Sequence, residues 1–287
     1  MKIIENKKVF FAISLVIIIV GLSLAAIRGF NYGIDFTGGT VIQIEMDEYI
    51  PTEEIREIVD GYDPSATINH IGDQREIIQI RTTESFNNET RVSLYNEFKE
   101  KYNLDDADRL SSGQYGPQIG AEIRNKAVIS IIIATIGMLL YITFRFQFSY
   151  GISAIVALIH DVLIVLAVYS IFRIPVNSPF VAAMLTVVGY SINDTIVVFD
   201  RIRENLKTAK RNAFAETAEL SIKQTIRRSL NTSFTTILAI TALYILGVDS
   251  IKEFTLPLIA GILTGTYSSI FIASPVWVLI KSKKGNI

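Results

Sequence analysis

The sequence of 287 residues is half hydrophobic and carries only 19% charged residues, with a formal net charge of −1 at pH 7. Soluble domains average about 25% charged residues, so this composition argues against a soluble globular enzyme, and the near-zero charge excludes a globally basic nucleic-acid binder. No cysteine is present, which excludes disulfides, zinc–thiolate sites and thiol catalysis. The two histidines, His70 and His160, are too few for a multi-histidine metal site, and we expect neither a bound metal nor a cofactor.

The apolar residues are gathered in six blocks of about 20 residues, the length that crosses a hydrocarbon core about 30 Å thick. The blocks are residues 9–27, 127–144, 151–172, 179–199, 229–248 and 254–280. The first block exceeds the 7–15 residues of a signal-peptide core, so we expect a retained transmembrane helix, with cleavage near the small residues 23–25 as the alternative. The sequence therefore predicts a membrane bundle of six transmembrane helices.

Residues 30–118, between the first two blocks, are polar and predict a small α+β domain. The predicted elements are a strand at 41–46, a helix at 51–59, strands at 66–71 and 75–81 joined by a turn at 72–73, a helix at 87–102 and a weak strand near 108–112. The order β-α-β-β-α-β is that of a ferredoxin-like domain.

Lysine and arginine in the short connecting segments predict the orientation, because these residues concentrate on the cytoplasmic side. Fifteen of them lie in the two termini, after the second block and in the segment 200–228, whereas the opposite short segments hold Arg173 and Lys252. We therefore expect both termini to be cytoplasmic and the ferredoxin-like domain to be extracytoplasmic. The chain then divides into residues 1–29 (N-terminus and helix one), 30–118 (external domain) and 119–287 (helices two to six, with a cytoplasmic loop at 200–228).

Several polar residues lie within or beside the apolar blocks, where a charge costs about 2.5–3.5 kcal/mol on insertion scales. They are His160 and Asp161 in the third block, Asn193 and Asp194 in the fourth, and Arg228 beside the fifth. One interpretation is a proton or ion path, because a carboxyl group in low dielectric binds its proton more tightly, and a nearby arginine favours the ionised form. The alternative is hydrogen bonding that holds helices together. We favour the path for Asp194, whereas helix–helix bonding is the stronger interpretation for His160 and Asp161.

The stretch GIDFTGG at residues 33–39 follows the first block. It lacks the Gly-Lys-Ser/Thr ending of a phosphate-binding loop. We therefore interpret it first as a tight turn that leads into the first strand of the external domain.

This stretch and three others resemble SecF, the membrane-subunit family of the prokaryotic Sec protein translocase. The other three are GPQIG at 116–120, VGYSINDTIVVFDRIREN at 188–205 and RSLNTS at 228–233. The 188–205 stretch is long and highly specific, and the His160-Asp161 step is also similar to the family. The resemblance extends over nearly the whole chain, and the family motif after helix one comprises Gly33, Asp35, Phe36, Gly38 and Gly39.

The resemblance implies a non-enzymatic subunit in the prokaryotic plasma (inner) membrane. SecF-like proteins pair with SecD, and together they resemble the proton-driven resistance-nodulation-division exporters. The pair is expected to associate with the SecYEG channel and the translocating preprotein, within the lipid bilayer and without nucleic acid. It is expected to use the proton-motive force to complete translocation after the SecA ATPase has acted. By the family pattern, Asp194 is the intramembrane carboxylate tied to proton flow and Arg228 is the arginine tied to it.

Two other functions stay open from the residues alone. The chain could be a half-size proton-driven exporter of small molecules or lipids, although such exporters commonly fuse two six-span halves. It could also be a scaffold that transports nothing, in which the intramembrane polar residues only hold the bundle together. An Asp194→Asn substitution separates the scaffold from the transporters, since an amide still forms hydrogen bonds.

Overall fold

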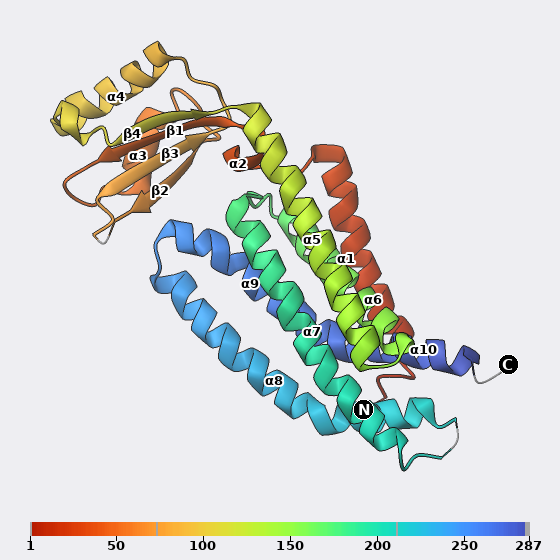
Figure 1. Cartoon of the computed structure of the whole chain (residues 1–287). Helices are drawn as coiled ribbons and strands as arrows, with labels where there is room; N and C mark the ends of the chain where they lie inside the picture. The colour runs from red at the N-terminus through yellow and green to blue at the C-terminus, as the bar shows by residue number, and fades with distance from the viewer. Residues whose placement is uncertain (1, 73, 211, 285–287) are drawn as a thin grey trace.

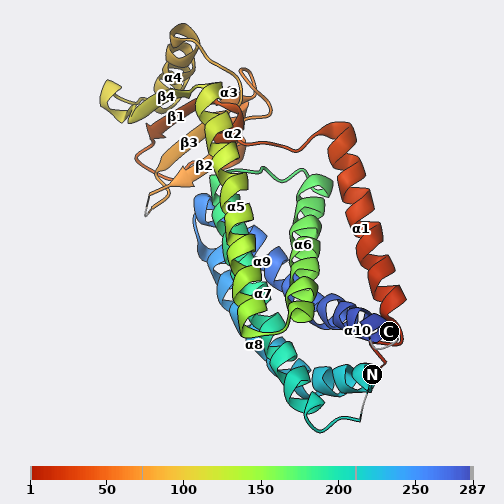
Figure 2. The same cartoon turned by 45° about the vertical axis from the view of Figure 1, so that its right-hand side comes forward.

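The computed structural model describes residues 2–72, 74–210 and 212–284. Within these ranges six helical spans are long and apolar enough to cross a membrane, as predicted. They are α1 (Lys7–Arg28), α5 (Pro117–Arg145), α6 (Phe148–Ile171), α7 (Ser178–Leu206), α8 (Phe214–Leu246) and a last span formed by α9 (Asp249–Ser268), the π-helix η2 (Ser269–Ala273) and α10 (Ser274–Lys284). A sheet domain lies at one end of the bundle, and α1 begins and α10 ends at the opposite end, which we call the remote end (Figure 1, Figure 2).

The helices beside the predicted cytoplasmic loop are longer than the apolar blocks. Helix α7 continues to Leu206 and α8 begins at Phe214, so the prediction of a loop over 200–228 is wrong for most of that segment. Glu, Arg, Lys and Leu are good helix formers, so these polar turns carry the helices beyond the apolar blocks that marked the predicted ends. Arg211, one of the cations counted for the orientation, lies outside the described residues.

Helices α6, α7 and α9 form the interior of the bundle, whereas α1, α5 and α8 expose most of their apolar side chains. Two glycines allow α9 to lie close against α7. A Cβ added to Gly261 would lie 2.2 Å from Cγ2 of Val187, and one added to Gly265 would lie 2.9 Å from Cβ of Ser191. Small residues permit such close approach between transmembrane helices, and here they bring the end of α9 beside the polar turn of α7.

The domain between α1 and α5 has the predicted element order β-α-β-β-α-β. Its elements are β1 (Gly39–Glu45), α3 (Thr52–Val59), β2 (Thr67–Ile71), β3 (Ile77–Thr82), α4 (Asn88–Tyr102) and β4 (Ser111–Tyr115). The strands form one antiparallel sheet in the order β2-β3-β1-β4. Side chains at alternate positions of β1 and β3, such as Ile42 and Ile80, pack with Ile55 of α3 and Phe98 of α4 in one apolar core.

Two details of this domain differ from the prediction or fall outside the described residues. The last strand occupies Ser111–Tyr115 rather than 108–112, because Asp105 and Asp108 cap a 3₁₀ turn (η1, Asp106–Asp108) that precedes it. The predicted turn at 72–73 includes Asp73, which lies outside the described residues, whereas Gly72 has a positive φ of 92°, which glycine readily adopts.

Candidate functional site

Asp194 lies on the buried face of α7, and its Oδ2 accepts a hydrogen bond of 2.6 Å from Oγ of Ser269. Ser269 is the first residue of η2, the π-helical turn in the last span. Such turns are frequent at functional sites because they change the direction in which successive side chains point. Asn193, predicted to share the path with Asp194, is exposed, and among the described residues none forms a side-chain hydrogen bond with it.

Asp161 is fully buried in the middle of α6 and has three hydrogen-bonding partners. Its Oδ2 accepts bonds from Oγ of Ser191 at 2.5 Å and from Oγ of Ser268 at 2.8 Å. Its Oδ1 lies 3.0 Å from Nδ1 of the adjacent His160. A carboxyl group taken out of water is costly unless such partners satisfy its oxygens, so the structure supplies the polar shell that this position requires.

His160 extends the network from α6 to α1 and α9. Its Nε2 lies 2.8 Å from Oγ of Ser14 on α1, and its ring stacks on Tyr267 of α9 with centroids 5.9 Å apart. Oγ of Ser14 lies 3.4 Å from Oη of Tyr267, which in turn donates to the backbone oxygen of Phe10 at 3.0 Å. The network therefore joins three helices that are far apart in the sequence.

The hydroxyl of Ser14 can take either of two roles toward His160. It can donate to Nε2, in which case Nδ1 carries the hydrogen that faces Asp161, or it can donate to Tyr267 and accept from Nε2. The distances fit both arrangements.

Two adjacent serines connect the two buried carboxyl groups. Ser268, the last residue of α9, donates to Asp161 on α6, and Ser269, the first residue of η2, donates to Asp194 on α7. Successive residues of a helix point in directions about 100° apart, which allows neighbours in the chain to reach two different helices. Neither serine was predicted as a site residue, and their signal in the sequence is a short polar run, residues 264–269, inside a long apolar block.

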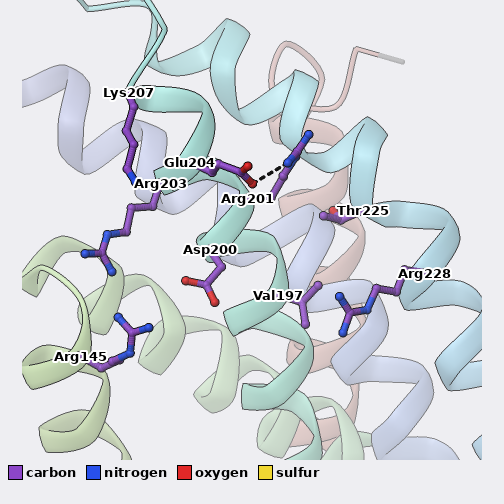
Figure 3. Close-up of a pocket in the computed structure, with 9 residues that line it drawn as sticks. All are labelled: Arg145, Val197, Asp200, Arg201, Arg203, Glu204, Lys207, Thr225 and Arg228. Atoms are coloured by element: carbon purple, nitrogen blue, oxygen red, sulfur yellow. Dashed lines mark hydrogen bonds and ion pairs between the residues drawn. The ribbon is translucent and has the colours of Figure 1, made fainter.

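Among the described residues, Arg228 is not a hydrogen-bonding or ion-pair partner of Asp194. It lies well inside α8, and its side chain lines a hollow of about 550 Å³ at the remote end, together with Val197 and Asp200 of α7 (Figure 3). Among the described residues no ion pair or hydrogen bond joins the Arg228 guanidinium to a carboxylate. Val197 follows Asp194 by three residues, so it lies on the same side of α7, one turn nearer the hollow. Arg228 therefore lines a hollow that also reaches the turn of α7 next to Asp194, without direct pairing to the acid.

The GIDFTGG motif forms the joint between the sheet and the bundle. Residues Ile34–Thr37 make a single helical turn (α2), and the chain enters β1 at Gly39, as predicted. Gly38 and Gly39 have φ of 79° and 147°, values that other residues rarely adopt. Phe36 is buried in an apolar cluster with residues of α6 and α7, and the N–H of Gly33 donates to the oxygen of Val176 at 2.8 Å.

Asp35 of the motif anchors an ion-pair network across this joint. Its Oδ1 lies 2.6 Å from Nη2 of Arg81 on β3, and its Oδ2 accepts from the backbone N–H of Ser178 at 2.8 Å. Nη1 of Arg81 lies 3.5 Å from Glu253 of α9, which also accepts from Asn177 at 2.7 Å. Arg81 and Glu253 were not predicted as site residues, because nothing in their local sequence shows that the fold brings them to Asp35.

The comparisons with known proteins agree with these features. Residues 95–283 match the family described as protein export membrane protein SecD/SecF, C-terminal, and residues 24–49 match the SecD/SecF GG motif. Protein translocase subunit SecF of Desulfurispirillum indicum is 38% identical over 92% of this chain and 86% of its own length. The SecF of Pseudomonas aeruginosa is 35% identical over 96% of this chain and 91% of its own. The chain belongs to the SecF family of protein translocase subunits.

Longer relatives of the SecF family match over part of their length. Protein translocase subunit SecDF of Bacillus subtilis is 35% identical over 98% of this chain, which covers 38% of that protein. The crystal structure of SecDF from Thermus thermophilus, described as a translocon-associated membrane protein, superposes with a TM-score of 0.81 at 35% identity, over 98% of this chain and 38% of that one. The SecF family places this chain in protein transport across a membrane.

Proposed function

We propose that this chain is the SecF subunit of a Sec translocase and that, with SecD, it uses the proton-motive force to help complete preprotein translocation through SecYEG after the SecA step. The observation that carries the proposal is the buried network that links His160, Asp161 and Asp194 through two serines in the middle of the bundle. A purely structural bundle gains little from two buried carboxyl groups, because removing them from water offsets most of what their hydrogen bonds contribute. Ionisable residues inside a membrane bundle are typical of proton relays.

In the proposed cycle, protonation of Asp194 favours one packing of α7 against the last span, and ionisation favours another. The ionised form requires polar neighbours, which are Ser269 in the buried network and Arg228 or water in the hollow at the remote end. One elementary charge that crosses 100 mV supplies about 2.3 kcal/mol, so several protons, or a pH gradient as well, are needed for a large movement. The proton gradient drives a change in helix packing, and this change needs no enzymatic step.

The proposed orientation places the remote end in the cytoplasm and the sheet domain outside. The helices alternate in direction, so the lysines and arginines that lie near the start of α1, the end of α5 and the 200–228 segment all fall at the remote end. We propose a plasma (inner) membrane location with both termini cytoplasmic, and a ferredoxin-like external domain that acts on the emerging polypeptide. The SecDF relatives join both subunits' names in one chain, which supports SecD as the direct partner.

The test is export into membrane vesicles that contain SecYEG, SecD, SecA and ATP, with and without an imposed proton gradient. Asp194→Asn keeps an oxygen that can accept from Ser269 but cannot cycle a proton. We expect normal insertion and normal binding to SecD, with loss of the gradient-dependent increase in export. Glu216→Gln, which neutralises an exposed acid at the remote end, is the matched control and should behave as wild type. A full response of Asp194→Asn to the gradient would show that the acid only holds helices together.

A further inference from the structure

Cations from three helices converge on the hollow that Arg228 lines at the remote end. Arg145 ends α5, Arg203 and Lys207 lie at the end of α7, and Arg228 projects from α8 (Figure 3). We call the hollow bounded by these four cations and Asp200 the basic hollow. The tendency of lysine and arginine to gather on the cytoplasmic side accounts for their number at this end, but it does not account for their convergence on one cavity.

The charge in the basic hollow is not balanced by the chain itself. Arg201 and Glu204, which also line it, form an ion pair of 2.5 Å with each other. Once these two are set aside, four cations face the single carboxylate of Asp200, an excess of three positive charges. Among the described residues none of the four cations forms an ion pair. Like charges that line one hollow repel each other, so an anion in the hollow would lower their mutual repulsion.

Two of the cations are held together without a counter-ion. The guanidinium of Arg145 lies 5.4 Å from the centre of the Phe146 ring, and that of Arg203 lies 6.0 Å from the same ring. Phe146 is itself buried, so the ring provides a fixed platform. A cation–π contact orients a guanidinium but leaves its N–H donors free, and guanidinium donors match the oxygens of a phosphate group.

An adjoining hollow of about 420 Å³ gives the site a second, less polar part. It shares Arg145, Arg203 and Lys207 with the basic hollow and is otherwise lined by residues that include Phe146, Tyr150 and Leu206. The three shared cations therefore stand between a strongly basic space and an aromatic one. A ligand with a charged head and an apolar body would fit both parts.

The position of the hollows along the bundle favours a lipid over a soluble anion. Arg145 ends one candidate membrane span, and the next begins three residues later at Phe148. Phe144 and Phe148 beside it are 95% and 58% exposed, and exposed apolar side chains on membrane spans face lipid rather than water. Phosphate groups of membrane lipids occupy this level, and basic pockets between transmembrane helices on the cytoplasmic side are suited to anionic headgroups.

We propose that the basic hollow is a binding site for the phosphate-bearing headgroup of an anionic phospholipid. Arg145, Arg203 and Lys207 hold the phosphate, and Phe146, Tyr150 and Leu206 contact the glycerol and the first part of the acyl chains. These six residues lie outside the buried network of Asp161 and Asp194. Arg228 lines the same hollow and belongs to the proposed proton cycle, so the test below leaves Arg228 unchanged.

The test counts lipids bound to the full chain by native mass spectrometry in mild detergent, with phosphatidylglycerol, cardiolipin or phosphatidylcholine added. The pocket variant is Arg203→Gln with Lys207→Gln. The matched control is Lys8→Gln with Lys223→Gln, which removes two exposed lysines, one on α1 and one on α8, from outside the hollow. Each cation near a membrane surface contributes about fivefold to the binding of an anionic lipid, so we expect the pocket variant to bind anionic lipids about 25-fold more weakly and the control to bind as wild type. Wild type should retain little phosphatidylcholine.

A second arm separates lipid from soluble phosphate. Inorganic phosphate and pyrophosphate are titrated into the wild-type complex with phosphatidylglycerol, and the melting temperature is followed with the fluorescence of Trp277, the sequence's single tryptophan. We expect the anionic lipid to raise the melting temperature and neither soluble anion to displace it at equal phosphate concentration. Displacement at equal concentration would overturn the lipid assignment. Equal loss of lipid from the pocket and control variants would show that anionic lipids are attracted to the basic surface in general, and would overturn the proposal that they bind in the basic hollow. An unchanged Trp277 emission spectrum in each variant shows that the variant is folded.

Discussion

Arg81→Ala tests whether the GIDFTGG motif connects the external domain to the bundle through charge. In the native structure Nη2 of Arg81 reaches Asp35 and Nη1 faces Glu253, so one guanidinium bridges two carboxylates from different parts of the fold. Alanine leaves the two acids without this cation. Arg81→Lys keeps the charge but has one nitrogen in place of a fork, so it cannot serve both acids equally.

The expected magnitude follows from the burial of the three side chains. Exposed ion pairs contribute about 0–1 kcal/mol, whereas removal of one partner from a fully buried pair costs about 3–5 kcal/mol. The side chains of Arg81, Asp35 and Glu253 are 16–18% exposed, which places this network between the two cases. We therefore expect Arg81→Ala to make opening of the joint easier by about 1–3 kcal/mol, which corresponds to about 5- to 150-fold in the opening equilibrium, with Arg81→Lys intermediate.

Hydrogen–deuterium exchange of the full chain in mild detergent measures this opening at the joint itself. The reporters are peptides covering residues 29–38 and 173–180, which contain the amides of Gly33 and Ser178 that bond across the joint. Arg56→Ala is the control, because Arg56 forms an exposed pair within the domain and should leave both peptides unchanged. The double variant with Asp35→Ala should show less than the sum of the two single effects, since the pair is lost in either one. Equal exchange in Arg81→Ala and wild type would refute the proposed joint.

Three further predictions concern single positions. Gly39→Ala should lower the stability of the sheet domain by about 2 kcal/mol or more, because φ of 147° is strained for alanine and the new Cβ would lie 2.1 Å from a backbone oxygen. The control is Gly113→Ala, where a Cβ meets nothing within 4 Å, and it should melt as wild type. Equal melting temperatures for the two variants would contradict the prediction. Burial raises the pKa of Asp63, but hydrogen bonds from Ser65 and Thr82 outweigh burial and hold that pKa below its usual 3.8. The stability that Asp63 contributes is therefore present above pH 3.8 and is lost as the pH falls below that value. Asp63→Asn should remove this acid-dependent step from melting temperatures measured between pH 6 and pH 3. Ser269→Ala removes the hydroxyl that donates to Asp194 at 2.6 Å. Leaving a buried acceptor unsatisfied costs about 1–3 kcal/mol, so this variant should reduce gradient-dependent export. Unchanged export would exclude Ser269 from the proton path.

The sequence alone determined the number of membrane spans, the element order of the small domain and the residues of the family motifs. These features follow from local patterns: apolar runs of membrane length, alternation in strands, and glycines where the backbone requires left-handed values. The buried positions of His160, Asp161 and Asp194 were also foreseeable, because a charged residue in an apolar helix must face the interior. The end of α7 and the start of α8 were not, since these turns are polar and helix formation does not require apolar residues.

Only the tertiary structure decided which groups meet. Ser268 and Ser269 look alike in the sequence, yet the close packing of α9 on α7 at Gly265 directs one to Asp161 and the other to Asp194. The family pattern ties Arg228 to Asp194, and the structure shows that its side chain lines the basic hollow. Hydrogen bonds and ion pairs act over about 3–4 Å, so contacts between residues distant in the chain depend on helix packing, which local sequence patterns do not encode.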